Sequence, residues 1–182
     1  MQRLLIVEDD HALRRALSAA LSPRVGSVTS CGSVREARSA LPAFRPDVMV
    51  LDVYLPDGTA LDVLEVAQAL PALPIIVAIS GQARPEESFL LAQQGVRAFV
   101  PKPLDLAALE QALDRVTAEP PDLVPHLRGA VGHAPVRDVE SAVRRTMVTE
   151  ALGRTRGSKS GAAKILRVSR QLLQHMVRST LD

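Results

Sequence analysis

The stretch Leu4-Leu5-Ile6-Val7-Glu8-Asp9 decides the fold, because it joins a run of apolar residues directly to two carboxylates. A similar arrangement returns twice: Val48-Met49-Val50-Leu51 precedes Asp52, and Ala98-Phe99-Val100-Pro101 precedes Lys102. Short, unbroken apolar runs are typical of strands that are covered on both faces in a parallel sheet. In such open α/β sheets, ligands bind at the carboxyl ends of the strands. The sequence therefore predicts that these charged groups meet at one edge of a sheet.

The rest of the first 119 residues supplies the alternation of strands and helices that this sheet needs. Strands are expected at residues 3–7, 26–29, 48–52, 75–80 and 98–100. The helices expected between them are marked by Leu13, Leu17 and Leu21; Val34, Ala37 and Leu41; Leu61, Leu64 and Leu70; Phe89 to Gln94; and Leu106, Leu109, Leu113 and Val116. We expect five βα units in a doubly wound, five-stranded parallel sheet of the α/β class.

Local signals place the turns and one helix start. Ser33 is followed three residues later by Glu36, which is the spacing of a capping box. Pro42 and Pro56-Asp57-Gly58 occur where the chain has to turn.

The charged groups at the expected edge favour one kind of chemistry. Carboxylates gathered in one place repel one another unless a hard cation lies among them, and Mg²⁺ binds one or two carboxylates together with waters and phosphate oxygens. A lysine ammonium beside them pairs with an added phosphoryl group. Glu8, Asp9, Asp52 and Lys102 therefore predict a magnesium-dependent phosphoryl-acceptor site.

On these residues, positions 1 to about 118 resemble the receiver domain of bacterial two-component response regulators, which has a flavodoxin-like fold. The resemblance implies that Glu8 and Asp9 hold Mg²⁺ and that Asp52 is the phosphoacceptor and a further metal ligand. The backbone carbonyl of Tyr54 would complete the protein ligands. The phosphodonor would be the phosphohistidine of a sensor histidine kinase, with the protein supplying positioning and charge neutralisation.

The same resemblance assigns the residues that respond to phosphorylation. Ser80 corresponds to the switch hydroxyl, Phe99 to the aromatic switch residue, and Lys102-Pro103 to the family's lysine and its usually cis proline. Movement of Ser80 and Phe99 would remodel the surface of the fourth helix, fifth strand and fifth helix. We expect this surface to pair two receivers into a homodimer. Taken singly, each residue also has an ordinary explanation as a loop, cap or core residue.

Other features bound the class of protein. The chain has one cysteine, Cys31, which is expected to be an inert core residue in a reduced compartment. It shows no long apolar span and no signal peptide, so we expect a soluble cytoplasmic protein without a membrane partner. A Gly-rich phosphate loop and a second set of catalytic residues are also lacking, which argues against an independent enzyme.

Charge divides the chain into two parts. Residues 1–119 hold 11 Lys and Arg against 15 Asp and Glu, whereas residues 120–182 hold 11 against 5. Between them, residues 119–135 are rich in proline and glycine and are expected to form a linker without helix or strand. The clustered positive charge of the C-terminal part suits a phosphate backbone, although it also fits a solvated helix face.

The C-terminal pattern predicts a small all-α domain at residues 136–182. A long helix starts at Val136 and ends near Arg154 to Gly157, Ser158 caps a short helix, Arg167-Val168 forms a turn, and Ser169 caps a last helix. The small Ala162 and Ala163 allow the helices to cross closely, as in a helix-turn-helix.

This segment resembles the Fis-type DNA-binding domain of nitrogen-regulator activators and of short photosynthesis and redox response regulators. The matching run contains Gly157, Ala162-Ala163, Leu166, Val168, Ser169-Arg170 and Leu173. The resemblance implies dimerisation through the long helix and binding of double-stranded DNA. The residues expected to contact DNA are Lys159, Arg167, Ser169, Arg170, Gln171, Gln174 and Arg178.

The segment also departs from that pattern. Arg167 stands at the turn where glycine is common, so it is expected to adopt a left-handed conformation. Leu172 replaces a small polar residue, and His175 and Met176 replace basic ones. Taken together, the two resemblances lead us to expect a transcriptional regulator that is phosphorylated on Asp52 and binds DNA. The alternative is a signalling adaptor whose basic helices bind a protein through a stripe that contains Leu172 and Met176.

Overall fold

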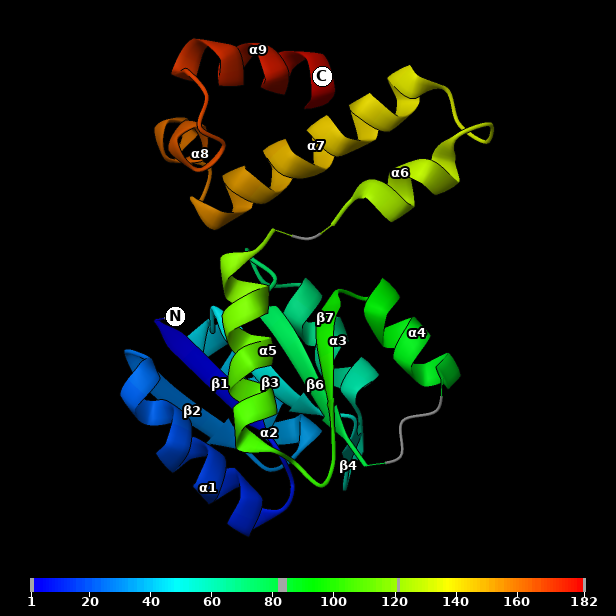
Figure 1. Cartoon of the computed structure of the whole chain (residues 1–182). Coiled ribbons are helices and arrows are strands. Elements are labelled where there is room, and N and C mark those ends of the chain that lie inside the picture. The colour runs from blue at the N-terminus through cyan, green and yellow to red at the C-terminus, as the bar shows by residue number, and fades with distance from the viewer. Residues whose placement is uncertain (1, 82–84, 121, 182) are drawn as a thin grey trace. The chain divides into compact units, whose positions relative to one another are not determined.

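The computed structural model of the chain describes residues 2–81, 85–120 and 122–181. These residues form two compact units, residues 1–121 and 122–182, and each unit is described by itself (Figure 1). Among the residues that the structure describes, no helix is both long enough and apolar enough to cross a membrane.

A parallel sheet forms the centre of the first unit. Its strands are β1 (Arg3–Val7), β2 (Ser27–Cys31), β3 (Val48–Asp52), β6 (Ile75–Ser80) and β7 (Val96–Pro101). The spatial order is β2-β1-β3-β6-β7, which is the flavodoxin-like order of a doubly wound sheet. The predicted fold class is therefore confirmed. The strand expected at residues 26–29 lies one residue later and extends to Cys31.

Helices cover both faces of this sheet (Figure 1). They are α1 (His11–Leu21), α2 (Val34–Phe44), α3 (Ala60–Gln68), α4 (Pro85–Gln93) and α5 (Leu106–Ala118), and a 3₁₀ turn η1 (Ser22–Arg24) follows α1. Alternate strand residues point to opposite faces, so Leu4 packs with α1 and α5, whereas Leu5 packs with α2, α3 and α4. The third helix ends at Gln68, so Leu70, expected on its stripe, lies beyond its end.

The start of α2 differs in one detail from the predicted capping box. Ser33 Oγ accepts a hydrogen bond from Glu36 N at 3.1 Å, as that motif requires. The Glu36 carboxylate, however, accepts from Gly32 N at 2.7 Å instead of from the Ser33 backbone. The first turn of α2 is therefore capped, with the return bond displaced by one residue.

A short hairpin follows β3. Strands β4 (Tyr54–Leu55) and β5 (Gly58–Thr59) pair in antiparallel fashion, with Tyr54 opposite Thr59 and Leu55 opposite Gly58. The run Pro56-Asp57-Gly58 indicated a loop, but two-residue strands are too short to leave a periodic signal in the sequence.

The second unit consists of α6 (Val124–Ala130), α7 (Val136–Arg154), α8 (Lys159–Ile165) and α9 (Arg170–Leu181). Helix α6 lies inside the segment that was expected to be a linker without helix, and that expectation was wrong there. Pro125 occupies the first turn of α6, where a proline lacks no hydrogen bond that the helix needs. The prolines and glycines therefore mark the ends of a short helix.

A small core holds α7, α8 and α9 together. Its buried residues are Val148, Ala151, Ala162, Ala163 and Leu173. The two alanines allow close packing of α8, as the sequence indicated. Between α8 and α9, Arg167 has a φ of 54°, so the expected left-handed conformation at this position is confirmed.

Candidate functional site

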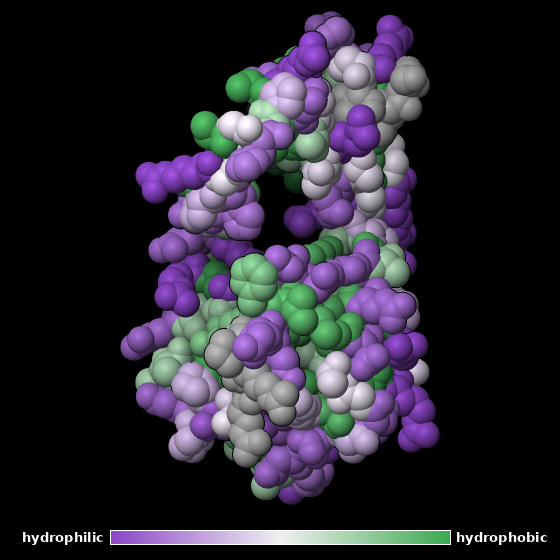
Figure 2. All heavy atoms as spheres, turned by 90° about the vertical axis from the view of Figure 1, so that its right-hand side faces the viewer, coloured by the Kyte–Doolittle hydropathy of each residue, from purple (hydrophilic) through white to green (hydrophobic). Residues whose placement is uncertain are grey.

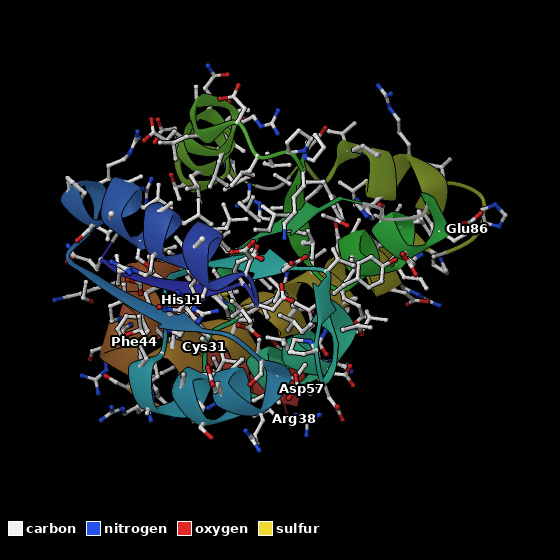
Figure 3. The ribbon with its side chains drawn as sticks, turned by 90° about the horizontal axis from the view of Figure 1, so that it is seen from below. His11, Cys31, Arg38, Phe44, Asp57 and Glu86 are labelled. Atoms are coloured by element: carbon white, nitrogen blue, oxygen red, sulfur yellow. The ribbon has the colours of Figure 1, made fainter. Side chains whose placement is uncertain are left out.

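The carboxyl ends of the parallel strands bring the predicted charged residues together. Glu8 directly follows β1, Asp52 ends β3, Ser80 ends β6, and Lys102 directly follows β7. Figure 3 looks at the molecule from this side, where His11 marks the start of α1 just after the acidic pair. The strand order places β1, β3, β6 and β7 next to one another, so residues separated by 94 positions become neighbours.

Lys102 is the centre of this cluster. Its Nζ lies 2.6 Å from Asp52 Oδ2 and 2.9 Å from each carboxylate oxygen of Glu8. The Glu8 side chain has no solvent exposure, that of Asp52 has 6%, and that of Lys102 has 24%. One partly exposed cation thus balances two buried carboxylates, which leaves a net negative charge at the site.

Burial and the ion pairs change the proton affinities of Glu8 and Lys102. Burial raises the pKa of Glu8 above its usual value; the charge of Asp52 adds to this effect, and the hydrogen bond from Lys102 opposes it. Burial alone would lower the pKa of Lys102, but hydrogen bonds to Asp52 and Glu8 outweigh that effect and raise it. Lys102 is therefore held in its charged form.

The remaining donor atoms fit a divalent cation. Carboxylate oxygens of Glu8, Asp9 and Asp52 all lie within 4.8 Å of one another. Oε2 of Glu8 is buried and forms an ion pair with Lys102 Nζ at 2.9 Å, but it accepts no hydrogen bond from any residue that the structure describes. A buried acceptor without a hydrogen bond is costly in a folded protein unless another group satisfies it. Oxygen ligands of this kind suit Mg²⁺, which usually takes one or two carboxylates and keeps several waters.

The backbone of the acidic pair is fixed by neighbours that the sequence did not single out. Arg14 Nη1 lies 2.5 Å from the Glu8 carbonyl oxygen and 3.1 Å from that of Asp9 and donates to both. Glu8 N donates to the Cys31 carbonyl at 3.1 Å. A side chain added at Gly32 would come within 2.9 Å of Arg14 Nη1, so this glycine leaves room for the arginine. Arginine one turn into a helix is common, which is why no sequence signal identified it.

The other predicted receiver residues lie around the same edge. Ser80 is mostly buried, and its carbonyl accepts from Lys102 N at 2.8 Å. Phe99 on β7 is partly buried against the core on the α2–α4 side of the sheet. The Lys102–Pro103 peptide bond is cis, as the resemblance implied.

Tyr54 joins this edge to α4. Its backbone N–H donates to Asp52 Oδ1 at 3.3 Å, and its hydroxyl donates to the carboxylate of Glu87. Cys31 is buried, and burial raises the pKa of its thiol to about 11, as expected of an inert core residue.

In the second unit, the side chains that were expected to contact DNA all lie on the surface. They are Lys159, Arg167, Ser169, Arg170, Gln171, Gln174 and Arg178. Ser169 Oγ accepts from Leu172 N at 3.1 Å, which caps the start of α9. Leu172 is exposed, whereas Met176 packs against the core of the unit. The two residues therefore do not form a free apolar stripe.

Comparison with known families identifies the first unit. The model of the response regulator receiver domain matches residues 4–114. Two solved structures share the fold with a TM-score of 0.60 and 29% identity: the receiver domain of HemR from Leptospira biflexa, over 67% of this chain and 98% of that one, and the N-terminal domain of an uncharacterized protein from Wolinella succinogenes, over 65% and 95%.

Curated relatives have different activities. The DNA-binding transcriptional regulator NtrC of Rhizobium meliloti is 32% identical over 118 residues, covering 64% of this chain and 24% of the relative. A protein-glutamate methylesterase/protein-glutamine glutaminase of Caulobacter vibrioides is 32% identical over 120 residues, covering 64% of this chain and 35% of the relative. The chain thus spans about a third or less of these relatives.

Proposed function

Because this chain belongs to the response regulator receiver domain family, we propose that it is a two-component response regulator that is phosphorylated on Asp52 and acts on DNA through its second unit. The observation that carries the first part is the cluster of Glu8, Asp9 and Asp52, in which the buried Oε2 of Glu8 is paired with Lys102 but accepts no hydrogen bond from the described residues. This arrangement holds a nucleophilic carboxylate next to a cation and a site for a second cation.

The proposed reaction is an in-line phosphoryl transfer. The phosphorus–nitrogen bond of a kinase phosphohistidine breaks while a bond forms between phosphorus and an Asp52 carboxylate oxygen, and the leaving imidazole keeps the electron pair. Lys102, now paired with Asp52 Oδ2, would turn to a phosphoryl oxygen after transfer. The protein performs no proton transfer in this step; it positions the carboxylate and offsets charge.

Mg²⁺ is the cation that we propose for the acidic cluster. Glu8, Asp9, Asp52 and the backbone carbonyl of Tyr54 would hold it. When bound, the cation neutralises charge on the phosphoryl oxygens and on the carboxylates. The chain's own contribution is to keep the oxygen atoms within reach of one another in a largely buried site.

The response would travel through Ser80 and Phe99 to the surface of α4, β7 and α5. Ser80 lies at the site, and Phe99 follows on the neighbouring strand, paired with Ala78. Phe89 and Leu90 on α4 are 64% and 47% exposed. Figure 2 shows the side of the first unit that carries α4, where apolar atoms gather. We propose that two phosphorylated receivers pair through this surface, since exposed apolar side chains favour association.

The second unit supports the DNA-binding part. Helices α8 and α9 are joined by a short turn, and α9 presents Arg170, Gln171 and Gln174 to solvent at its start. In helix-turn-helix proteins, early residues of the second helix contact base edges. The relatives that share the receiver include regulators whose names describe DNA binding. The activity of the methylesterase relatives stays with those proteins, because this chain covers only about a third of them.

An adaptor that binds a protein through the second unit is the other candidate. Its support is the exposure of Leu172 and Ile165, at 47% and 48%. The packing of Met176 against the core removes half of the apolar stripe that this function would use. With the apolar stripe reduced, the exposed basic side chains of the second unit favour DNA binding over binding of a protein.

Labelling with acetyl phosphate tests the first part. Wild-type protein should take up phosphate only with Mg²⁺ present, because the acidic cluster otherwise repels the donor. Asp52→Asn should abolish the labelling. Stoichiometric labelling of the Asn variant would show that another residue is the acceptor.

Titration of duplex DNA at several salt concentrations tests the second part, with an operator obtained by unbiased selection. Arg170→Ala should cost about 1–3 kcal/mol on the operator and less on scrambled DNA, as expected of a base contact. Lys159→Ala should weaken both duplexes alike and reduce the salt slope by about one, as a phosphate contact would. If neither substitution changes binding and Leu172→Asp abolishes a protein complex, the adaptor function is correct.

A further inference from the structure

A carboxylate outside the phosphorylation site links the two halves of that site. Asp57 lies in the turn between β4 and β5, three residues after Tyr54, and both of its oxygens accept hydrogen bonds from the start of α2. We propose that Asp57 is a positioning residue that sets the metal affinity of the acidic cluster. This inference rests on the proposed function, because the metal ligands are those named above.

The contact between Asp57 and α2 is a helix cap supplied from a distant part of the chain. Val34 N donates to Asp57 Oδ1 at 2.7 Å, and Arg35 N donates to Oδ2 at 3.0 Å. Ser33, the local cap, satisfies the next N–H, that of Glu36. Asp57 thus accepts from two of the free N–H groups of the first turn, and Ser33 accepts from a third. Figure 3 shows Asp57 beside α2.

The other side of α2 leads back to the acidic pair. Helix α2 follows β2 after two residues, and the last residue of β2, Cys31, accepts a hydrogen bond from Glu8 N at 3.1 Å. The segment that carries Glu8 and Asp9 is therefore tied to the β2–α2 connection. Asp57 ties the segment that carries Asp52 and Tyr54 to the same connection.

The hairpin transmits this restraint to the metal ligands. Tyr54 pairs with Thr59 and Leu55 with Gly58, so the turn that carries Asp57 moves together with Tyr54. Mg²⁺ requires nearly ideal octahedral geometry with short metal–oxygen distances. A small displacement of the Tyr54 carbonyl relative to Glu8 and Asp9 should therefore weaken binding. A residue that only stabilised α2 would leave these relative positions unchanged.

The matched pair Asp57→Ala and Ser33→Ala separates capping of α2 from positioning of the metal ligands. Each substitution removes a cap of α2, but only Asp57→Ala removes the link between α2 and the hairpin that carries Tyr54. Tyr54 is the single tyrosine, and the chain has no tryptophan, so intrinsic fluorescence reports on the site itself. Titration with MgCl₂ of the full chain should show about 10-fold weaker binding for Asp57→Ala. Ser33→Ala should bind within about twofold of the wild type.

Two further measurements complete the test. Asp57→Asn keeps one acceptor oxygen and should recover part of the affinity. With acetyl phosphate, Asp57→Ala should need more Mg²⁺ for half-maximal labelling but reach the wild-type rate when Mg²⁺ saturates. Equal Mg²⁺ affinities for Asp57→Ala and Ser33→Ala overturn the positioning role while leaving the proposed function intact. A wild-type protein that neither binds Mg²⁺ nor becomes labelled overturns both.

Discussion

The two units of this protein place their charged groups in opposite ways. In the first unit, Glu8 and Asp52 are buried at the end of a sheet whose core fills both faces. In the second unit, the buried residues that the structure describes are five apolar ones, and the basic side chains lie on the surface. The difference teaches that a large apolar core can offset the desolvation cost of buried carboxylates, whereas a small core is accompanied by charged side chains that stay in contact with solvent.

The comparison also separates two routes to function. The receiver depends on short distances between particular oxygen and nitrogen atoms, such as the 2.6 Å between Lys102 Nζ and Asp52 Oδ2. The DNA binding proposed for the second unit would depend on the summed field of surface cations, which tolerates movement of each side chain. The predictions below test this contrast, from the largest expected effect to the smallest.

The difference in core size should appear as a difference in tolerance to cavities. Leu173 and Leu109 are both fully buried, one in each unit. Replacing either leucine with alanine should cost about 2–5 kcal/mol. Leu173→Ala should therefore unfold the small second unit at room temperature, whereas Leu109→Ala should leave the receiver folded with a lower melting temperature. Calorimetry of the full chain with both variants measures this. If Leu173→Ala still shows separate unfolding transitions for both units, the two units do not differ in their tolerance to cavities.

The buried carboxylates of the receiver should need Lys102 when no metal is bound. Lys102→Met leaves Glu8 and Asp52 without their shared cation, which should cost about 1–3 kcal/mol in the presence of a chelator. Mg²⁺ should then stabilise the variant more than the wild type, because the cation replaces the lost charge. Thermal unfolding with EDTA and with MgCl₂ provides the measurement. Lys159→Met, at an exposed lysine of the second unit, is the control. It should change neither the stability of the receiver in EDTA nor its stabilisation by Mg²⁺.

The left-handed backbone of Arg167, in the turn between α8 and α9, should cost stability. Arg167 adopts a left-handed conformation, so Arg167→Gly should stabilise the second unit by about 1 kcal/mol. Arg167→Ala keeps the Cβ and the strain, and it should give no such gain. If the guanidinium contacts phosphates, both variants should lose DNA affinity equally. Urea unfolding and duplex titration measure the two effects, and a stabilised Ala variant would show that strain is not the cause.

The smallest effect concerns a partly exposed cap in the receiver. Asp62 accepts from Thr59 N at 2.8 Å and from the Thr59 hydroxyl at 3.2 Å, and these bonds lower its pKa below 3.8. A depressed carboxylate pKa gives stability that is present above the unfolded value and is lost as the pH falls through the folded one. Asp62→Asn should therefore lower stability slightly at pH 7 and make less difference below pH 3.8. Urea titrations at several pH values test this. If the loss of stability in Asp62→Asn grows as the pH falls, the predicted pH dependence is wrong.

Much of the receiver was predictable because its signals are local. Unbroken apolar runs mark the buried strands, and charged residues directly after them fall at the ligand-binding edge in any parallel sheet. The helices of the second unit were predictable for similar reasons, since Ser158 and Ser169 precede them as caps. Helix α6 was missed because its proline was interpreted as a break, although it stands in the first turn.

The sequence by itself determined the order of elements, the edge that carries the acidic residues and the separation of charge between the two units. Only the tertiary structure decided that Lys102 balances two carboxylates and that Arg14 and Asp57 hold the surrounding loops. It also decided that Glu8 Oε2 accepts no hydrogen bond from the part of the chain that is described. The physical reason is range. Apolar periodicity and caps act over a few residues, whereas these contacts join positions that only the winding of the sheet brings together.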